Sequence, residues 1–171
     1  MIEEAKLNTS LMFRQACAFA DCAKFCEIEP NNIIECRFKT HTVAGIVNSA
    51  FSCELFIKAL LVHPNGYNIK GHKLKELWNA LKKKDPLLTS SIEEKMTSLF
   101  ESNNEALFTQ LLDNISNAFT YWRYIYEKKN GTINMNFLKD FRILLRNECC
   151  IKLYGKPWED YKEELLSFPS E

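Results

Sequence analysis

The sequence contains little glycine or proline, with five of each among its 171 residues. Because flexible linkers are rich in such residues, little of the chain is predicted to be linker. Runs that alternate between apolar and polar residues, which indicate β-strands, are scarce as well. Hydrophobic residues make up 46% and charged residues 26% of the chain, which is an ordinary globular composition. A chain of this length can bury a real core, so we predict one domain over residues 1–171.

An excess of charge is also missing, because 22 Lys and Arg residues balance 22 Asp and Glu residues. This balance gives no general attraction to nucleic acid or to an anionic membrane, although a local basic patch is still open. Residues 1–4 are acidic and no basic region precedes an apolar run, so we expect no signal peptide. The longest mostly apolar stretch, 43–62, contains Asn48, Glu54 and Lys58, which favours a buried helix over a membrane span. We therefore expect a cytoplasmic protein that does not bind a membrane.

Metal and phosphate motifs are absent from the sequence. Of the seven cysteines, Cys17, Cys22 and Cys26 lie in one helical pattern, and neither they nor Cys149 and Cys150 form the paired CxxC spacing of zinc sites. Reduced thiols in a cytoplasmic core are the better interpretation. The chain has no Walker motif, no GxGxxG and no GxSxG. We predict no metal and no cofactor.

Apolar residues spaced by three and four are abundant, and this spacing is typical of α-helices. A capping box at Ser90–Glu93 predicts the start of one of them. The predicted helices cover about 12–26, 43–62, 72–82, a segment from Ser90, one long helix over 107–125, 134–154, and a tail helix beginning near Trp158. Short connections between helices with one apolar face imply an all-α, single-domain bundle of about five to seven helices.

Three of these segments, in this order, resemble the HEPN (higher eukaryotes and prokaryotes nucleotide-binding) superfamily. Residues 50–61 are similar to the family helix that carries a Glu before a Lys-Ala-Leu-Leu ending. Residues 71–77 resemble its Gly-His-x-Leu turn, and residues 118–127 its helix with an Arg-Tyr pair. With their connections they cover about 43–145. The resemblance implies a HEPN-like helical bundle, dimerisation, and roles in RNA cleavage, nucleotide binding, phage defence or toxin–antitoxin pairs.

The motif by which HEPN nucleases cut RNA is missing. Those members carry an arginine followed, after four to six residues, by a histidine, and Arg123, Arg142 and Arg146 have no histidine at that distance. Arg37 and His41 are separated by only three residues and precede the Glu54 helix, so we interpret them as a solvated pair one helical turn apart. This departure favours a protein that is not an enzyme. If it is an enzyme, we expect a metal-independent ribonuclease.

Three functional hypotheses follow. The first is a non-catalytic HEPN-like binding or interaction module, the partner of a toxin, nucleotidyltransferase or defence protein. The second is an RNA endonuclease with a non-standard active site formed by Glu54, His72 and Arg123. The third is a helical scaffold of unrelated function. Family analogy and the surplus aromatic residues of the helix that contains Tyr121 and of the tail predict a homodimer, and RNA, a nucleotide or a second protein is the expected partner.

Glu54 lies on the apolar face of its helix, in register with Val47, Ala50 and Ile57. A lone buried carboxylate is costly, so we expect it either to be protonated or to have a cationic partner. Lys58, one turn later, is a weaker candidate for this partner.

We predict that Arg123 is the better partner for Glu54, because its planar guanidinium can form two parallel hydrogen bonds with a carboxylate. His72 has three interpretations. It could cap the start of its helix, join the polar network of Glu54 and Arg123, or act as a general base.

Aromatic residues surround Arg123 and could stack on RNA bases. Trp122 shares the apolar face of its helix and is predicted to be core, whereas Tyr121 and Tyr124 point elsewhere. Packing or a dimer surface is the favoured interpretation. Tyr124 and Tyr126 remain weaker candidates for ligand binding.

Overall fold

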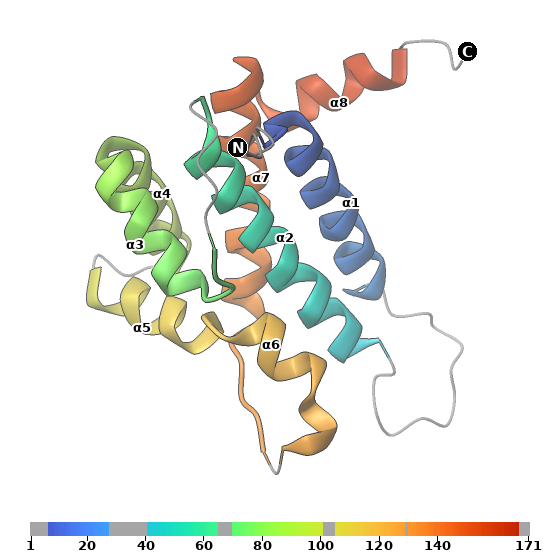
Figure 1. The fold of residues 1–171 in the computed structure, drawn as a ribbon, viewed down its shortest axis with the longest axis vertical. Helices are drawn as coiled ribbons and strands as arrows, with labels where there is room; N and C mark the ends of the chain where they lie inside the picture. The colour runs from blue at the N-terminus through green and yellow to red at the C-terminus, as the bar shows by residue number, and fades with distance from the viewer. Residues whose placement is uncertain (1–6, 28–40, 65–69, 101–104, 129, 168–171) are drawn as a thin grey trace, which may run out of the picture.

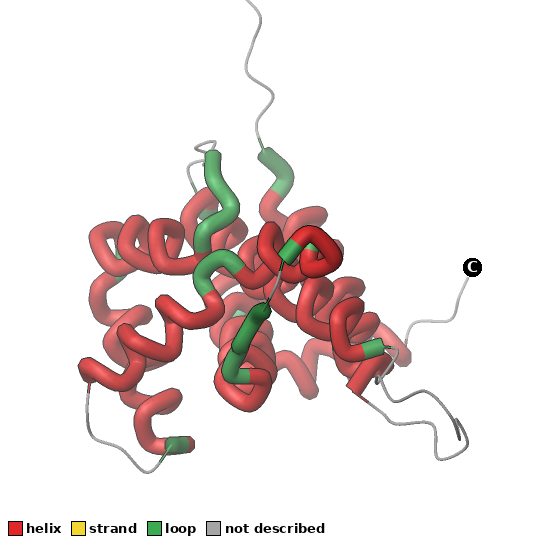
Figure 2. The backbone as a smooth tube through the Cα atoms, turned by 90° about the horizontal axis from the view of Figure 1, so that it is seen from below, coloured by secondary structure: helices red, strands yellow, loops and turns green. Residues whose placement is uncertain are grey.

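The computed structural model describes residues 7–27, 41–64, 70–100, 105–128 and 130–167. Within these ranges there is no strand, so the predicted all-α bundle is confirmed (Figure 2). Pro30, Cys36, Arg37 and Phe168 lie outside the described residues. The helices are α1 (Thr9–Glu27), α2 (Thr42–Val62), α3 (Leu74–Lys84), α4 (Pro86–Leu99), α5 (Glu105–Ile115), α6 (Ala118–Arg123), the 3-10 helix η1 (Ile125–Glu127), α7 (Met135–Tyr154) and α8 (Trp158–Ser167).

Helix α2 lies at the centre of the bundle and contacts α1, α3, α6 and α7 (Figure 1). It is long and apolar enough to cross a membrane by length and composition, but 72% of its most apolar window is buried inside the protein. A helix that is apolar on almost every side is expected where other helices surround it. Helices α5 and α6 cover one end of the bundle, and α8 projects from the other (Figure 1).

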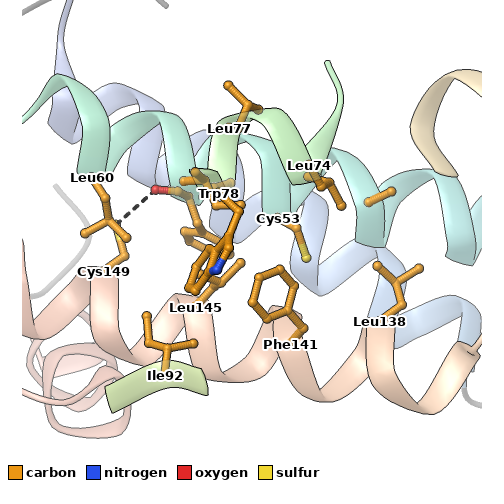
Figure 3. Close-up of a cluster of buried hydrophobic side chains, with 14 of the residues drawn as sticks. Cys53, Leu60, Leu74, Leu77, Trp78, Ile92, Leu138, Phe141, Leu145 and Cys149 are labelled. Carbon is orange, nitrogen blue, oxygen red and sulfur yellow. Dashed lines mark hydrogen bonds between the residues drawn. The ribbon is translucent and has the colours of Figure 1, made fainter. Parts of the chain in front are cut away.

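The core between α2, α3 and α7 is built around Trp78 of α3. Its ring packs against that of Phe141 of α7, with 5.4 Å between the centroids (Figure 3). The ring of Phe108 of α5 lies 5.6 Å from it, also between centroids. The indole nitrogen donates a hydrogen bond of 2.9 Å to Glu93 of α4, so the polar atom of this buried ring is satisfied. Cys149 of α7 contacts the carbonyl of Phe56 at 3.8 Å in the same core (Figure 3).

The long helix predicted over 107–125 is wrong, because the chain turns at Ser116 and Asn117 between α5 and α6. The backbone nitrogen of Leu74 donates to the carbonyl of Ser116 at 3.0 Å, and that of Lys75 donates to the Ser116 hydroxyl at 3.1 Å. The first N–H groups of any helix lack intrahelical partners. The turn at Ser116 therefore satisfies the start of α3 and fixes it beside the start of α6.

The start predicted for the fourth helix is also wrong, because Ser90 and Glu93 lie inside α4. Helix α4 begins at Pro86, with Asp85 as its N-cap residue. The Asp85 carboxylate accepts a hydrogen bond of 3.2 Å from the backbone nitrogen of Leu88, and a proline at the first helical position needs no partner for its nitrogen. Glu93 instead accepts bonds from Trp78, as described above, and from Lys82.

The boundaries predicted for the last long helix are confirmed. Asn134 caps the start of α7 by accepting a bond of 2.9 Å from the nitrogen of Phe137. Gly155 ends the helix with φ +74°, a left-handed conformation that favours glycine. The tail helix predicted from Trp158 is present as α8.

The described cysteines are free thiols, and most of them are buried. Burial raises the pKa of Cys17 and of Cys53 to about 12, and it raises the pKa of Cys149 well above its ordinary value. Cys22 is exposed on α1. The described part of the chain contains no group of three or more His, Cys, Asp and Glu side chains that could hold a metal ion.

Candidate functional site

Glu54 of α2 is buried, with 1% of its side chain exposed. Its Oε1 atom accepts a hydrogen bond of 2.7 Å from Nζ of Lys58, one turn later on the same helix. The same atom lies 2.9 Å from Nδ1 of His72. The other oxygen, Oε2, is buried and has no hydrogen bond with any described residue. The carboxylate is therefore held through one oxygen by a cation and an imidazole.

His72 lies in the short segment that leads into α3. Gly71 before it has φ +104°, a conformation that side chains rarely adopt, and this turn directs His72 back over α2. A carboxylate can only accept hydrogen bonds, so the bond to Glu54 places a proton on Nδ1. The side chain of His72 is 56% exposed, and no described residue bonds to its Nε2 atom. Helix α3 begins at Leu74, so His72 does not cap it and instead joins the Glu54 network.

The predicted ion pair between Glu54 and Arg123 is wrong. The guanidinium carbon of Arg123 lies over the ring of Phe119, 5.0 Å from its centroid, and over the ring of Tyr124 at 4.7 Å. One of its nitrogens donates to the Tyr124 hydroxyl at 2.8 Å. Helix α6 ends at Arg123, which brings this side chain to the surface, while Lys58 supplies the cation that Glu54 needs. Among the described carboxylates, none forms an ion pair with Arg123.

Phe119 links the two halves of the site. Its ring lies 5.8 Å from that of His72, between centroids, and it is also the ring beneath Arg123. The Phe119 ring also stacks on the ring of Phe51 of α2, with 4.6 Å between the centroids, and Phe51 packs edge-to-face against Phe19 of α1. The imidazole and the guanidinium are therefore neighbours across one aromatic ring that is fixed by α2.

The weaker candidates, Tyr124 and Tyr126, are exposed to 39% and 77%. Their rings lie 6.3 Å apart in an edge-to-face arrangement at the end of α6. Tyr121 has a different role, because its hydroxyl donates to the carbonyl of Asn130 and closes the following loop. Trp122 is partly buried and packs against the core, which agrees with the prediction made for it. Only Tyr124 and Tyr126 of these four aromatic residues present much ring surface to a ligand.

The arrangement suits an anionic ligand with a planar ring. It offers an oriented imidazole, a guanidinium without a carboxylate partner, and exposed aromatic rings for stacking. An imidazole held by a buried carboxylate can also move a proton, as general acids and bases do. A metal is disfavoured because Lys58 already occupies the Glu54 oxygen that faces His72.

Sequence reasoning did not identify the buried arginines of α7 as buried. Arg142, with 2% of its side chain exposed, donates to both carboxylate oxygens of Glu27 at 2.8 and 3.1 Å and to the Ser49 hydroxyl at 3.1 Å. Arg146 pairs with Asp21 at 2.9 Å and lies over the ring of Trp158. These contacts join α7 to α1, α2 and α8. We assign them to stability, because the Arg142 guanidinium is enclosed.

The three segments that resemble the HEPN superfamily meet at this site. Residues 50–61 lie in α2, residues 71–77 lead into α3, and residues 118–127 form α6 and η1. Helix α2 contacts both α3 and α6. No protein-family model, no curated protein and no solved structure matches this chain. Membership of the superfamily therefore stays a prediction from the motifs.

Proposed function

We propose that the protein is a non-catalytic, HEPN-like binding module that holds single-stranded RNA or a nucleotide on the face formed by His72, Phe119, Arg123, Tyr124 and Tyr126. We call this surface the α6 face. The observation that carries the proposal is the exposed imidazole of His72, oriented by the buried Glu54 and adjacent to a guanidinium that lies over aromatic rings. Exposed aromatic rings beside arginine suit single-stranded nucleic acid, whose bases can stack on them.

The charge around the α6 face supports an anionic ligand. Lys70 and Lys128 are exposed, and no described carboxylate pairs with either of them. Two lysines that follow His72 are paired with carboxylates: Lys73, which precedes α3, pairs with Glu76 at 2.9 Å, and Lys75 of α3 pairs with an aspartate of α5 at 3.0 Å. A balanced chain can thus still carry a local basic patch, and such a patch raises the association rate and affinity for a phosphate backbone.

A binding assay tests the proposal. Fluorescence anisotropy with a labelled single-stranded RNA should show saturable binding that weakens as salt increases. Tyr126→Ala should weaken binding by roughly 1–3 kcal/mol if the ring stacks on a base. The matched control is Leu87→Ala, because Leu87 is 84% exposed on α4, away from the α6 face. Equal loss in both variants, or no binding by the unmodified protein, would contradict the proposal.

A ribonuclease is the second candidate, and the contact between Glu54 and His72 is what favours it. A neutral imidazole with its proton on Nδ1 has a lone pair on Nε2, which could accept the proton of a ribose hydroxyl. Incubation of the purified protein with total RNA, in the presence of a chelator, tests this candidate. Cleavage that disappears in His72→Asn would replace the binding module with an enzyme.

A further inference from the structure

The geometry points to a phosphate group as the part of the ligand that the α6 face recognises, held between Nε2 of His72 and the N–H edge of Arg123, with affinity controlled by protonation of His72. This inference rests on the proposed function, because it names the chemical group through which RNA or a nucleotide is held. Nε2 of His72 and the N–H groups of Arg123 form no hydrogen bond with a described carboxylate.

The first donor is defined by Glu54. The carboxylate is 1% exposed and already bonded to Lys58, so it holds the Nδ1 proton of His72 in place. The imidazole can then take up or release a proton only at Nε2. When Nε2 is unprotonated, its lone pair faces the ligand and repels a phosphate oxygen. When Nε2 is protonated, it becomes a charged donor to that oxygen.

The second donor is Arg123. The rings of Phe119 and Tyr124 lie against the guanidinium carbon at 5.0 and 4.7 Å, so stacking of a base on this group competes with both rings. Only one of its nitrogens bonds to a described residue, the hydroxyl of Tyr124. A guanidinium carries five N–H donors in one plane, and its edge matches the oxygens of a phosphate. The remaining donors therefore favour a phosphate over a base.

A neighbouring lysine reduces the repulsion between a bound phosphate and the Glu54 carboxylate. Lys58 shares the Glu54 oxygen that binds His72, which offsets the negative charge beneath the imidazole. Among the described residues, Glu54 of α2 bonds to the imidazole and Lys58 bonds to the same carboxylate oxygen. Arg123 of α6 lies on the Phe119 ring that neighbours His72, and Lys70 and Lys73 are close to it in sequence. Carboxylates, lysines and arginines ordinarily keep their charge between about pH 5 and 8, where imidazoles titrate. The part of an RNA affinity change over this range that His72→Asn removes can thus be attributed to His72.

Nuclear magnetic resonance of the imidazole C–H groups gives a direct reading, because the chain contains three histidines. The signal of His72 is the one that His72→Asn removes. We expect this signal to shift on addition of single-stranded RNA and of adenosine 5′-monophosphate. Inorganic phosphate, added alone, shows whether the free anion is sufficient or whether the nucleoside is needed.

Two substitutions separate the two donors. An asparagine amide can replace Nδ1 as the donor to Glu54 but has no atom at Nε2, so His72→Asn keeps the buried contact. The unmodified protein should bind RNA about tenfold more tightly at about pH 6 than at about pH 8, the change expected for one charged hydrogen bond. His72→Asn should lose this difference and bind as weakly at both pH values as the unmodified protein at the higher one. Arg123→Gln should weaken binding at both pH values and keep the pH difference.

Lys83→Gln serves as the matched control, because it removes one positive charge from the exposed end of α3. It should change RNA affinity less than Arg123→Gln at the same salt concentration. The inference is overturned if RNA affinity is the same at both pH values and His72→Asn binds RNA as well as the unmodified protein does. The proposed function would not be affected by that result. If RNA and nucleotide do not bind but inorganic phosphate shifts the His72 signal, the proposed function fails and the phosphate site remains. A His72 signal that none of the three ligands shifts overturns the inference.

Discussion

Replacement of Glu27 by Ala should be among the most destabilising changes available in this protein. Arg142 is 2% exposed, and Glu27, itself 24% exposed, binds it through both oxygens at 2.8 and 3.1 Å. Without Glu27 the guanidinium stays buried with only the Ser49 hydroxyl as a partner, and its Nε atom already lacks one. Breaking a fully buried pair costs about 3–5 kcal/mol, and the partial exposure of Glu27 reduces this to about 2–4 kcal/mol.

Urea denaturation followed by circular dichroism measures this loss, and the midpoint of thermal unfolding should fall by roughly 5–15 °C. Arg142→Met supplies the decisive comparison, because it removes the buried charge and leaves a carboxylate that solvent can reach. We expect it to cost about 1–2 kcal/mol. The double variant should then be more stable than Glu27→Ala alone, since no buried charge is left unpaired. A double variant less stable than Glu27→Ala would refute this reasoning.

Three further predictions concern other parts of the molecule. In the native protein, iodoacetamide should modify the exposed Cys22 and spare Cys53. Burial raises the pKa of the Cys53 thiol to about 12, so little of it is the reactive thiolate at lower pH. Mass spectrometry after brief labelling measures the difference between the two cysteines. Equal labelling of the two would contradict the burial. Gly71→Ala should cost about 1 kcal/mol, because its φ of +104° strains any side chain, and denaturation against the unmodified chain measures it. Finally, light scattering should show a homodimer, and a monomer at about ten times the concentration used for binding would contradict the prediction.

The burial of Glu54 could be predicted from the sequence because it depends only on the period of one helix. Val47, Ala50 and Ile57 recur with it at helical spacing, and a helix repeats that spacing whatever lies around it. Lys58 as a neighbour follows from the same geometry, since residues four apart lie on one side of a helix. These predictions needed no knowledge of how the helices pack.

The position of Arg123 could not be predicted, because it depends on a break that the local pattern conceals. Apolar residues continue in register through 107–125, whereas the hydrogen bonds that Ser116 accepts from Leu74 and Lys75 stabilise a turn there. Those bonds join residues about forty positions apart, which no window of sequence contains. Once the helix ends and restarts, the face assigned to Arg123 no longer holds.

Arg142 was missed for a different reason. It follows Phe141 directly and lies one turn after Leu138, so its position was visible in the core face of α7. The predicted core face of this helix held apolar residues only, and no position was predicted for the arginine beside them. Asp85 and Pro86 carry the signal at which α4 begins, and the capping-box spacing of Ser90 and Glu93 lies inside that helix.

The turn at Ser116 also determines where the chain can gain or lose residues. Helix α5 precedes this turn, and an extra residue within it would rotate buried residues such as Phe108 out of the core. An extra residue between Ser116 and Phe119 would instead rotate α6 by about 100° about its axis. Phe119 would then lose its contact with the imidazole of His72, and Arg123 would be carried away from the imidazole as well. An insertion before this serine therefore disturbs the core, and one after it disturbs the candidate site.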